Sequence, residues 1–201
     1  MNFLRFPELE ARGAGHAFTL REEPAPTVAE VPKILREAGL PRDFVMGEQT
    51  HGVGVAVVRQ ADVGRVIPLV DGLVTRERGL ALVIRVADCG PVWIHCAKTG
   101  AIGLVHSGRK GTEARVVSAT IRKMREEFGS EPKEMLGLLG PCIRPPHYEV
   151  DFASEILRQL EREKVGTVVD SGLCTASDRT RFYSYRAEKG QGGRHFAVAS
   201  V

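Results

Sequence analysis

The sequence predicts a mixed α/β fold, because helix-like and strand-like hydrophobic patterns alternate along its 201 residues. In three segments the apolar residues recur at steps of three and four, which is the spacing of one buried helix face. Between these segments lie short runs rich in branched and aromatic residues, which are typical of strands. No internal repeat, low-complexity tract or long linker interrupts the alternation. We therefore expect residues 1–201 to form one domain.

Three helices are predicted from start signals and apolar spacing. The first follows Thr27, whose separation from Glu30 is that of a capping box. The second covers 112–128, where apolar residues recur at steps of four, three and four. The third follows Asp151, the expected cap, and runs to about Glu163. Strands are predicted over 53–58, 80–86, 92–96, 101–105, 135–139 and 195–201.

Composition and charge exclude several classes of protein. No apolar run approaches the roughly 20 residues of a membrane-spanning helix, so we expect no membrane insertion. The net charge of +3 is spread over short mixed runs, which disfavours specific nucleic-acid binding. Glu8 and Glu10 interrupt the apolar stretch that a secretory signal would need, which favours a cytoplasmic protein. The four cysteines are too few and too scattered for a disulfide framework, so we expect free thiols or metal ligands.

Three short segments each carry a potential metal ligand beside glycine at a predicted strand end. They contain His51, Cys89 and His106. Strand ends in α/β folds are where ligand crevices form, so the segments can converge on one pocket. Two imidazoles and one thiolate suit Zn²⁺, and three protein ligands leave a fourth position for water. The alternative is that both histidines bond to the backbone and Cys89 is a small buried apolar residue.

The motifs around these residues resemble those of the YfiH or laccase-domain family, which is polyphenol oxidase-like in its older name. The matching segments are Gln49-Thr50-His51-Gly52, Asp71-Gly72-Leu73-Val74-Thr75, Ala87-Asp88-Cys89-Gly90-Pro91, His106-Ser107-Gly108, Gly140-Pro141-Cys142-Ile143 and Phe182-Tyr183-Ser184-Tyr185-Arg186. The resemblance covers most of the chain between His16 and Arg194. It implies a layered α/β sandwich of the YfiH-like and CNF toxin-like type.

The resemblance also implies an activity and a site. His51, Cys89 and His106 match the positions that bind the catalytic metal, which is expected to be Zn²⁺ and less readily copper. The implied activity is that of a purine nucleoside phosphorylase, acting on adenosine- or inosine-type nucleosides with phosphate, together with adenosine deamination. The usual zinc deaminase signature, His-x-Glu with Pro-Cys-x-x-Cys, is absent, so deamination would need another general acid or base. A monomer or a small homo-oligomer is expected.

Four further residues are predicted to bind substrate. Gln49 adjoins the first ligand motif, and Lys110 precedes the predicted long helix, where its charge and the helix dipole suit phosphate. Arg21 and Arg186 lie in family-like motifs, and a guanidinium matches phosphate in bidentate geometry. A solvated surface position is the alternative for each basic residue. Asp88 is expected to be structural, because adjacent strand residues face opposite ways.

The chain departs from the family pattern at two places. The family usually has Trp where this chain has Arg109, and the segments that normally follow residues 16–21 are absent. Two other functions stay open. Cys89 and His106 could act as nucleophile and base of a cysteine hydrolase or deamidase. The resemblance also allows an editing role in peptidoglycan-precursor synthesis.

Overall fold

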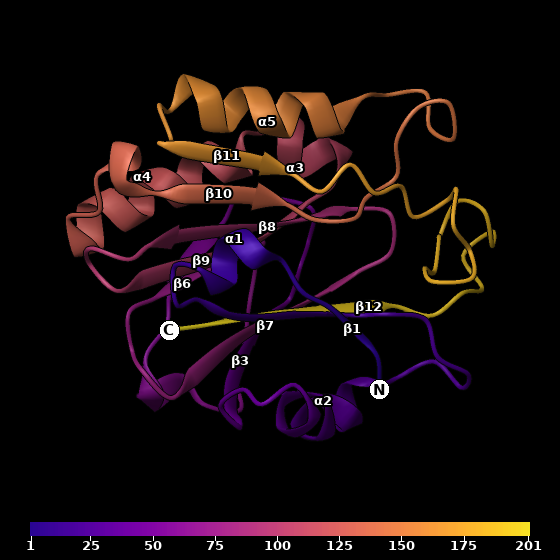
Figure 1. Ribbon diagram of the computed structural model, residues 1–201, viewed down its shortest axis with the longest axis horizontal. Helices are drawn as coiled ribbons and strands as arrows, with labels where there is room; N and C mark the ends of the chain where they lie inside the picture. Colours follow the sequence, from indigo (N-terminus) through magenta and orange to yellow (C-terminus); the bar gives the residue numbers. More distant parts are fainter.

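The computed structural model describes residues 1–201 as a stack of four layers, two sheets enclosed by helices (Figure 1). The strands are β1 (Phe3–Leu4), β2 (Gly15–Thr19), β3 (Asp43–Gly47), β4 (Val55–Val57), β5 (Val66–Ile67), β6 (Gly72–Thr75), β7 (Leu80–Val86), β8 (Gly90–Cys96), β9 (Ala101–Ser107), β10 (Leu136–Leu139), β11 (Thr167–Asp170) and β12 (His195–Ser200). The α-helices are α1 (Pro7–Glu10), α2 (Val31–Glu37), α3 (Arg109–Glu113), α4 (Val116–Phe128) and α5 (Phe152–Arg162). Three short 3₁₀ helices cover Val28–Glu30, Gln60–Asp62 and Pro132–Glu134.

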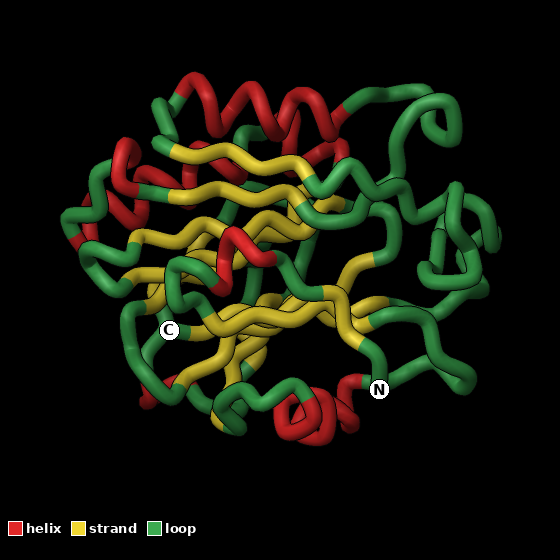
Figure 2. The backbone as a smooth tube through the Cα atoms, viewed as in Figure 1, coloured by secondary structure: helices red, strands yellow, loops and turns green.

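Each sheet has six strands and mixes parallel with antiparallel pairs. The first has the order β1-β2-β12-β7-β3-β5 and the second the order β11-β10-β8-β9-β6-β4. Helix α2 covers the outer face of the first sheet, and α4 and α5 cover the outer face of the second (Figures 1 and 2). None of the helices combines the length and apolar character needed to cross a bilayer.

The run Leu80–Val86 is almost wholly apolar because β7 is covered on both sides. Leu82 and Ile84 belong to the core between the two sheets, whereas Ala81 and Val83 pack with α2. Trp93 fills the space between the sheets, and its indole N–H donates to the Val198 carbonyl at 2.8 Å. A strand that is buried on both faces has apolar residues at successive positions, instead of alternating polar and apolar ones. Packing on both faces of the sheet fixes where β7, β8 and β9 end.

Most predicted elements are confirmed, but one predicted helix is divided into two in the structure. The capping box of Thr27 and Glu30 forms, and Asp151 accepts from the Ser154 N–H at the start of α5. The helix predicted over 112–128 is instead two helices, because Arg115 adopts φ 64° between α3 and α4. A left-handed arginine carries no sequence signal, since this conformation favours Gly, Asn or Asp. The predicted strand 53–58 is shorter, and six strands are absent from the prediction: the edge strands β1, β5 and β11 and the interior strands β2, β3 and β6.

Candidate metal centre

Three separate parts of the chain bring His51, Cys89 and His106 together. His51 lies in the loop after β3, Cys89 in the turn between β7 and β8, and His106 within β9. One ligand atom from each residue lies within 4.8 Å of the other two. The two imidazole rings meet edge to face with centroids 4.7 Å apart. His51 is exposed, Cys89 is half-buried and His106 is buried, so the cluster has one side open to solvent.

Asp71 at the start of β6 organises the two histidines. Its Oδ1 accepts from His106 Nδ1 at 2.7 Å and from the His51 backbone N–H at 2.9 Å, while Oδ2 accepts from the Gly52 N–H at 2.8 Å. Because Nδ1 of His106 is bound to the carboxylate, Nε2 is the nitrogen left for a ligand bond. The Asp71 carboxylate is fully buried yet satisfied by these donors. Burial raises its pKa, but His106 and the Gly52 N–H outweigh burial and leave the pKa lowered.

The backbone at the cluster takes conformations that ordinary residues rarely adopt. Gln49 and His51 have φ 62° and 61°, and Asp88 has φ 81°. Such values cost free energy outside glycine and persist only where neighbouring structure holds them, which is common at functional sites. Gly108 is needed for a different reason, because a Cβ there would lie 2.5 Å from the Cys89 sulfur. These positions let the three ligands approach one another.

The electrostatics of the cluster favour a thiolate next to an imidazolium. Burial raises the pKa of the Cys89 thiol, but the flanking His106 and His51 imidazoles outweigh burial and bring it down to about 7. Burial likewise lowers the pKa of His106, but Asp71 and Cys89 outweigh it and raise the pKa to about 9. The thiolate is the form of cysteine that binds metal or attacks an electrophile. A metal ion on Nε2 would displace the proton of His106, so binding would release protons.

The donor set fits a metal ion of the zinc type. Two imidazole nitrogens and a sulfur are ligands that Zn²⁺ and copper both accept. Bond lengths of about 2.0–2.3 Å place ligand atoms on one tetrahedral zinc roughly 3.5 Å apart. The three ligand atoms lie within 4.8 Å of one another, so they would need to move only slightly closer to bind one ion. The carboxylate–histidine arrangement of Asp71 and His106 is the usual support for a metal-bound histidine.

The cluster opens into a cavity of about 820 Å³, within the range of small-molecule sites. The aromatic residues Tyr148, Phe152 and Tyr185 line it. Its basic lining residues are Arg85, Arg109, Arg186, Lys189 and Arg194, whereas Glu48 and Asp88 are the acidic ones. Both Asp88 oxygens are engaged, by the Thr175 hydroxyl at 2.6 Å and the Arg186 N–H at 2.7 Å. The cavity therefore brings together three candidate metal ligands, aromatic faces and excess positive charge.

Two of the four predicted substrate-binding residues line this cavity. The Gln49 side chain exchanges two hydrogen bonds with the backbone of Arg85, at 2.6 and 2.8 Å, so its amide is already satisfied. Arg186 stacks on Tyr148 at 5.4 Å and forms an exposed ion pair with Glu149 at 2.9 Å. Exposed pairs of this kind are weak, so the guanidinium can exchange Glu149 for an anionic ligand.

The other two predicted residues lie outside the cavity lining. Lys110 is exposed on α3, and its neighbour Arg109 lines the cavity instead. Arg21 is engaged elsewhere, because its guanidinium binds Glu188 at 2.7 Å and Glu23 at 2.9 Å. Substrate contact by Lys110 and Arg21 stays a prediction.

Asp71 has a role that the sequence does not predict, although it lies in one of the family-like motifs. Its partner His106 lies 35 positions away along the chain, and only the pairing of β6 with β9 brings them together. The Asp-Gly motif before a strand was the available signal. Asp88, which was expected to be structural, bonds to Thr175 and to the Arg186 backbone rather than to a ligand residue.

The fold and the site define a mixed α/β protein with a two-histidine, one-cysteine candidate metal centre. The chain belongs to the family described as multi-copper polyphenol oxidoreductase laccase, whose model matches residues 15–163 and 150–201. It is 31% identical to a purine nucleoside phosphorylase of Streptomyces coelicolor, over 93% of this chain and 86% of that protein. It is 34% identical to a purine nucleoside phosphorylase of Corynebacterium glutamicum, over 79% of this chain and 74% of that protein.

Two solved structures share the fold over nearly the whole chain. YlmD of Geobacillus stearothermophilus has a TM-score of 0.89 at 21% identity, covering 100% of this chain and 96% of that chain. A hypothetical protein YfiH of Bacillus licheniformis has a TM-score of 0.89 at 20% identity, covering 99% and 96%. These findings confirm the predicted family and the mixed α/β, YfiH-like fold.

Proposed function

We propose that this protein is a zinc-dependent purine nucleoside phosphorylase that also deaminates adenosine. The observation that carries the proposal is the convergence of His51, Cys89 and His106 on the cavity, with ligand atoms within 4.8 Å. The names of the two bacterial relatives support the phosphorylase activity. Deamination and the choice of zinc rest on the family resemblance and on the donor chemistry.

The residues of the chain would divide the work as follows. His51, Cys89 and His106 would hold the ion, and zinc supplies a polarising charge and a bound water of lowered pKa. Asp71 keeps His106 in the tautomer that presents Nε2. Tyr148 and Tyr185 offer aromatic faces for a purine, since ring faces stack in offset geometry. Arg109 and Arg186 provide charge for phosphate on the cavity wall.

In phosphorolysis a phosphate oxygen bonds to the anomeric carbon of the ribose as the bond from that carbon to the purine nitrogen breaks. The departing purine accepts the proton that the attacking hydrogen phosphate carries. Basic side chains would lower the repulsion between phosphate and the developing negative charge on the purine. This demand matches a wall with more basic than acidic residues.

A second candidate function is favoured by the protonation of the same residues. With the pKa of Cys89 about 7 and that of His106 about 9, the pair has the charges of a cysteine nucleophile and its acid–base partner. Such an enzyme would be a hydrolase or deamidase with no need for metal. The two functions make opposite demands on Cys89.

Metal content separates them. Protein purified without added metal is expected to carry close to one zinc per chain by elemental mass spectrometry. Chelation should abolish phosphorolysis of inosine, and added Zn²⁺ should restore it. The Cys89→Asp variant should keep part of the metal, because a carboxylate also binds zinc, whereas a nucleophile has no such substitute. Cys174→Ser is the control for alkylation, since Cys174 is half-buried and lies outside the ligand set.

Each alternative has its own signature. Turnover that survives chelation but not alkylation of Cys89 would overturn the zinc proposal in favour of the cysteine hydrolase. Copper in place of zinc, with oxidation of phenols, would restore the older family description. Hydrolysis of a muropeptide precursor without action on nucleosides would instead establish the editing role.

A further inference from the structure

One part of the cavity wall, beside the turn that carries Cys89, has no regular secondary structure. We call residues 184–194 the wall turn; it lies between Tyr183 and β12. It contributes Tyr185, Arg186, Lys189 and Arg194 to the cavity lining. Three of these are basic, so the turn carries most of the positive charge that a phosphate-containing reaction would use. A segment without a ladder of backbone bonds needs other contacts to hold this shape.

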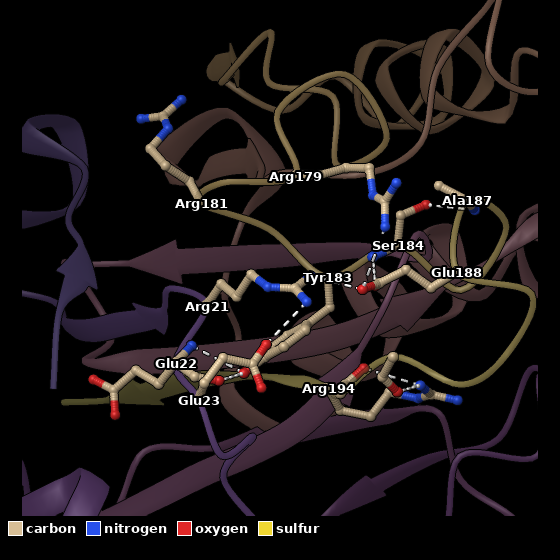
Figure 3. A network of polar contacts seen from close by, with 12 residues as sticks. Arg21, Glu22, Glu23, Arg179, Arg181, Tyr183, Ser184, Ala187, Glu188 and Arg194 are labelled. Carbon is tan, nitrogen blue, oxygen red and sulfur yellow. Dashed lines mark hydrogen bonds and ion pairs between the residues drawn. The ribbon is translucent and has the colours of Figure 1, made fainter.

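Glu188 supplies part of those contacts from within the turn, in addition to the bond of the Arg186 N–H to Asp88. Its Oε2 accepts from the Ser184 N–H at 2.9 Å, and its Oε1 accepts from Arg21 Nη1 at 2.7 Å. The side chain is 9% exposed, which is unusual for a carboxylate unless it is paired. Burial raises the pKa of Glu188, but Arg21 and the Ser184 N–H outweigh burial and leave the pKa lowered. Glu188 is therefore a charged, satisfied anchor (Figure 3).

Arg21 ties that anchor to the first sheet. It follows β2 along the chain, and its own backbone N–H donates to the Arg181 carbonyl at 2.7 Å. Its guanidinium lies 4.9 Å from the centre of the Tyr183 ring, so one face is covered while its edge binds Glu188 (Figure 3). A guanidinium held by stacking and by charge is strongly oriented.

The pair lies outside the cavity that it supports. Arg21 and Glu188 border a separate hollow of about 450 Å³, whereas the metal cluster belongs to the 820 Å³ cavity. Lys189, next to Glu188, is the residue that borders both. A change in Glu188 therefore reaches the cavity through the wall turn, without removing a cavity side chain.

We propose that Arg21 and Glu188 are a positioning pair that sets the wall turn and thereby the affinity for substrate. The proposal rests on the proposed nucleoside activity and gives Arg21 an indirect role in place of substrate contact. The wall turn meets substrate before and during reaction alike. Loss of the pair should therefore raise KM and change kcat little. The metal ligands lie on other segments and should keep their metal.

Three variants test the pair. Glu188→Gln keeps the shape and an acceptor for the Ser184 N–H but removes the charge. Arg21→Met keeps apolar length over Tyr183 and removes the charge. Arg21→Lys restores a positive charge without the planar fork. We expect KM for inosine or phosphate to rise about tenfold in the first two, with partial rescue in the third and kcat within about threefold of wild type.

The matched control is Asp178→Asn, which breaks a neighbouring ion pair. Asp178 binds Arg181 at 2.6 Å, and both side chains are partly exposed. Neither residue lines the cavity. The control should leave KM at its wild-type value. A loss of kcat in Glu188→Gln with KM unchanged, or an equal rise of KM in the control, would overturn the proposal.

Hydrogen exchange separates this proposal from the proposed function, because it needs no turnover. Amides of 184–194 should exchange faster in Glu188→Gln than in wild type, and amides of β8 and β9 should not. If wild-type protein fails to phosphorolyse nucleosides, the proposed function fails, while faster exchange confined to the wall turn still supports the positioning role. Unchanged exchange in this segment would overturn the positioning role, whatever the activity. A large drop in melting temperature with faster exchange throughout would also overturn it.

Discussion

Five of the six histidines of this protein fall into two groups that differ in what their ring nitrogens contact. His16, His95 and His195 are buried, and both ring nitrogens of each contact backbone groups. Burial lowers the pKa of each of the three, to about 4 for His195. His106 is equally buried, yet its partners are a carboxylate and a thiol, and its pKa is raised to about 9. All four of these histidines are buried, so burial does not distinguish them. The hydrogen-bond partners of the ring decide which histidine is available for chemistry.

The ligand histidines should be separated from the backbone-bound ones most sharply by metal content. His51→Ala, Cys89→Ala and His106→Ala are each expected to lose most of the bound zinc, because three ligands leave little redundancy. His95→Gln is the matched control, since His95 contacts the carbonyls of Ala101 and Arg12 only. Elemental analysis of the purified variants measures the difference. If His95→Gln loses as much zinc as the other three variants, the distinction between ligand histidines and backbone-bound histidines is wrong.

A second test uses pH, because His195 and His106 should act on stability in opposite directions. The folded pKa of His195 is about 4, below its usual 6.5, so its contribution is present above pH 6.5 and is lost as pH falls towards 4. The loss should amount to about 3 kcal/mol of unfolding free energy. The folded pKa of His106 is raised, so without metal its contribution is present below pH 6.5 and is lost as pH rises through about 9.

Denaturant unfolding of chelated protein between pH 4 and pH 9 measures both slopes. His195→Gln should flatten the acid limb whatever its absolute stability. On the alkaline side the lowered pKa of Cys89 opposes the raised pKa of His106, so His106→Gln is compared in a Cys89→Ser background, where it should flatten the alkaline limb. Equal acid limbs in wild type and His195→Gln would show that His195 is not held neutral.

The sequence could predict the convergence of His51, Cys89 and His106 better than the residues that support them. Cys89 and the two histidines lie beside glycines at strand ends, which is a local pattern. Asp71 could not be assigned, because its role depends on the register of β6 against β9. The break at Arg115 was missed because nothing in the local sequence favours a left-handed residue there. Local sequence patterns thus predict helices and strands, whereas the hydrogen-bond partners at the site depend on strand pairing between distant parts of the chain.

A smaller effect is expected from Asp71, which bonds to both candidate ligand histidines and lies outside the proposed ligand set. Asp71→Asn keeps an acceptor for His106 but turns an amide N–H₂ towards a backbone N–H, since Asp71 accepts from both His51 and Gly52. We expect zinc affinity to fall about 10–100-fold. Competition with a chromophoric chelator measures it. Asp88→Asn is the control, because Asp88 adjoins Cys89 but bonds to Thr175 and Arg186. An equal loss of zinc affinity in both variants would show that Asp71 does not specifically support the two histidines.

The smallest effect is expected at the wall of the cavity, where Lys110 and Arg109 are adjacent on α3 but only Arg109 lines it. An exposed lysine near a ligand contributes little, about 1 kcal/mol or less. Lys110→Ala should therefore raise KM for phosphate by about fivefold at most, and Arg109→Ala should raise it more. Neither change should alter deamination of adenosine, which uses no phosphate.

Steady-state kinetics of both reactions at varied phosphate concentration measures these effects. Equal losses in the two reactions would remove Lys110 from the phosphate site, and a larger effect at Lys110 than at Arg109 would assign the anion to the exposed side of α3.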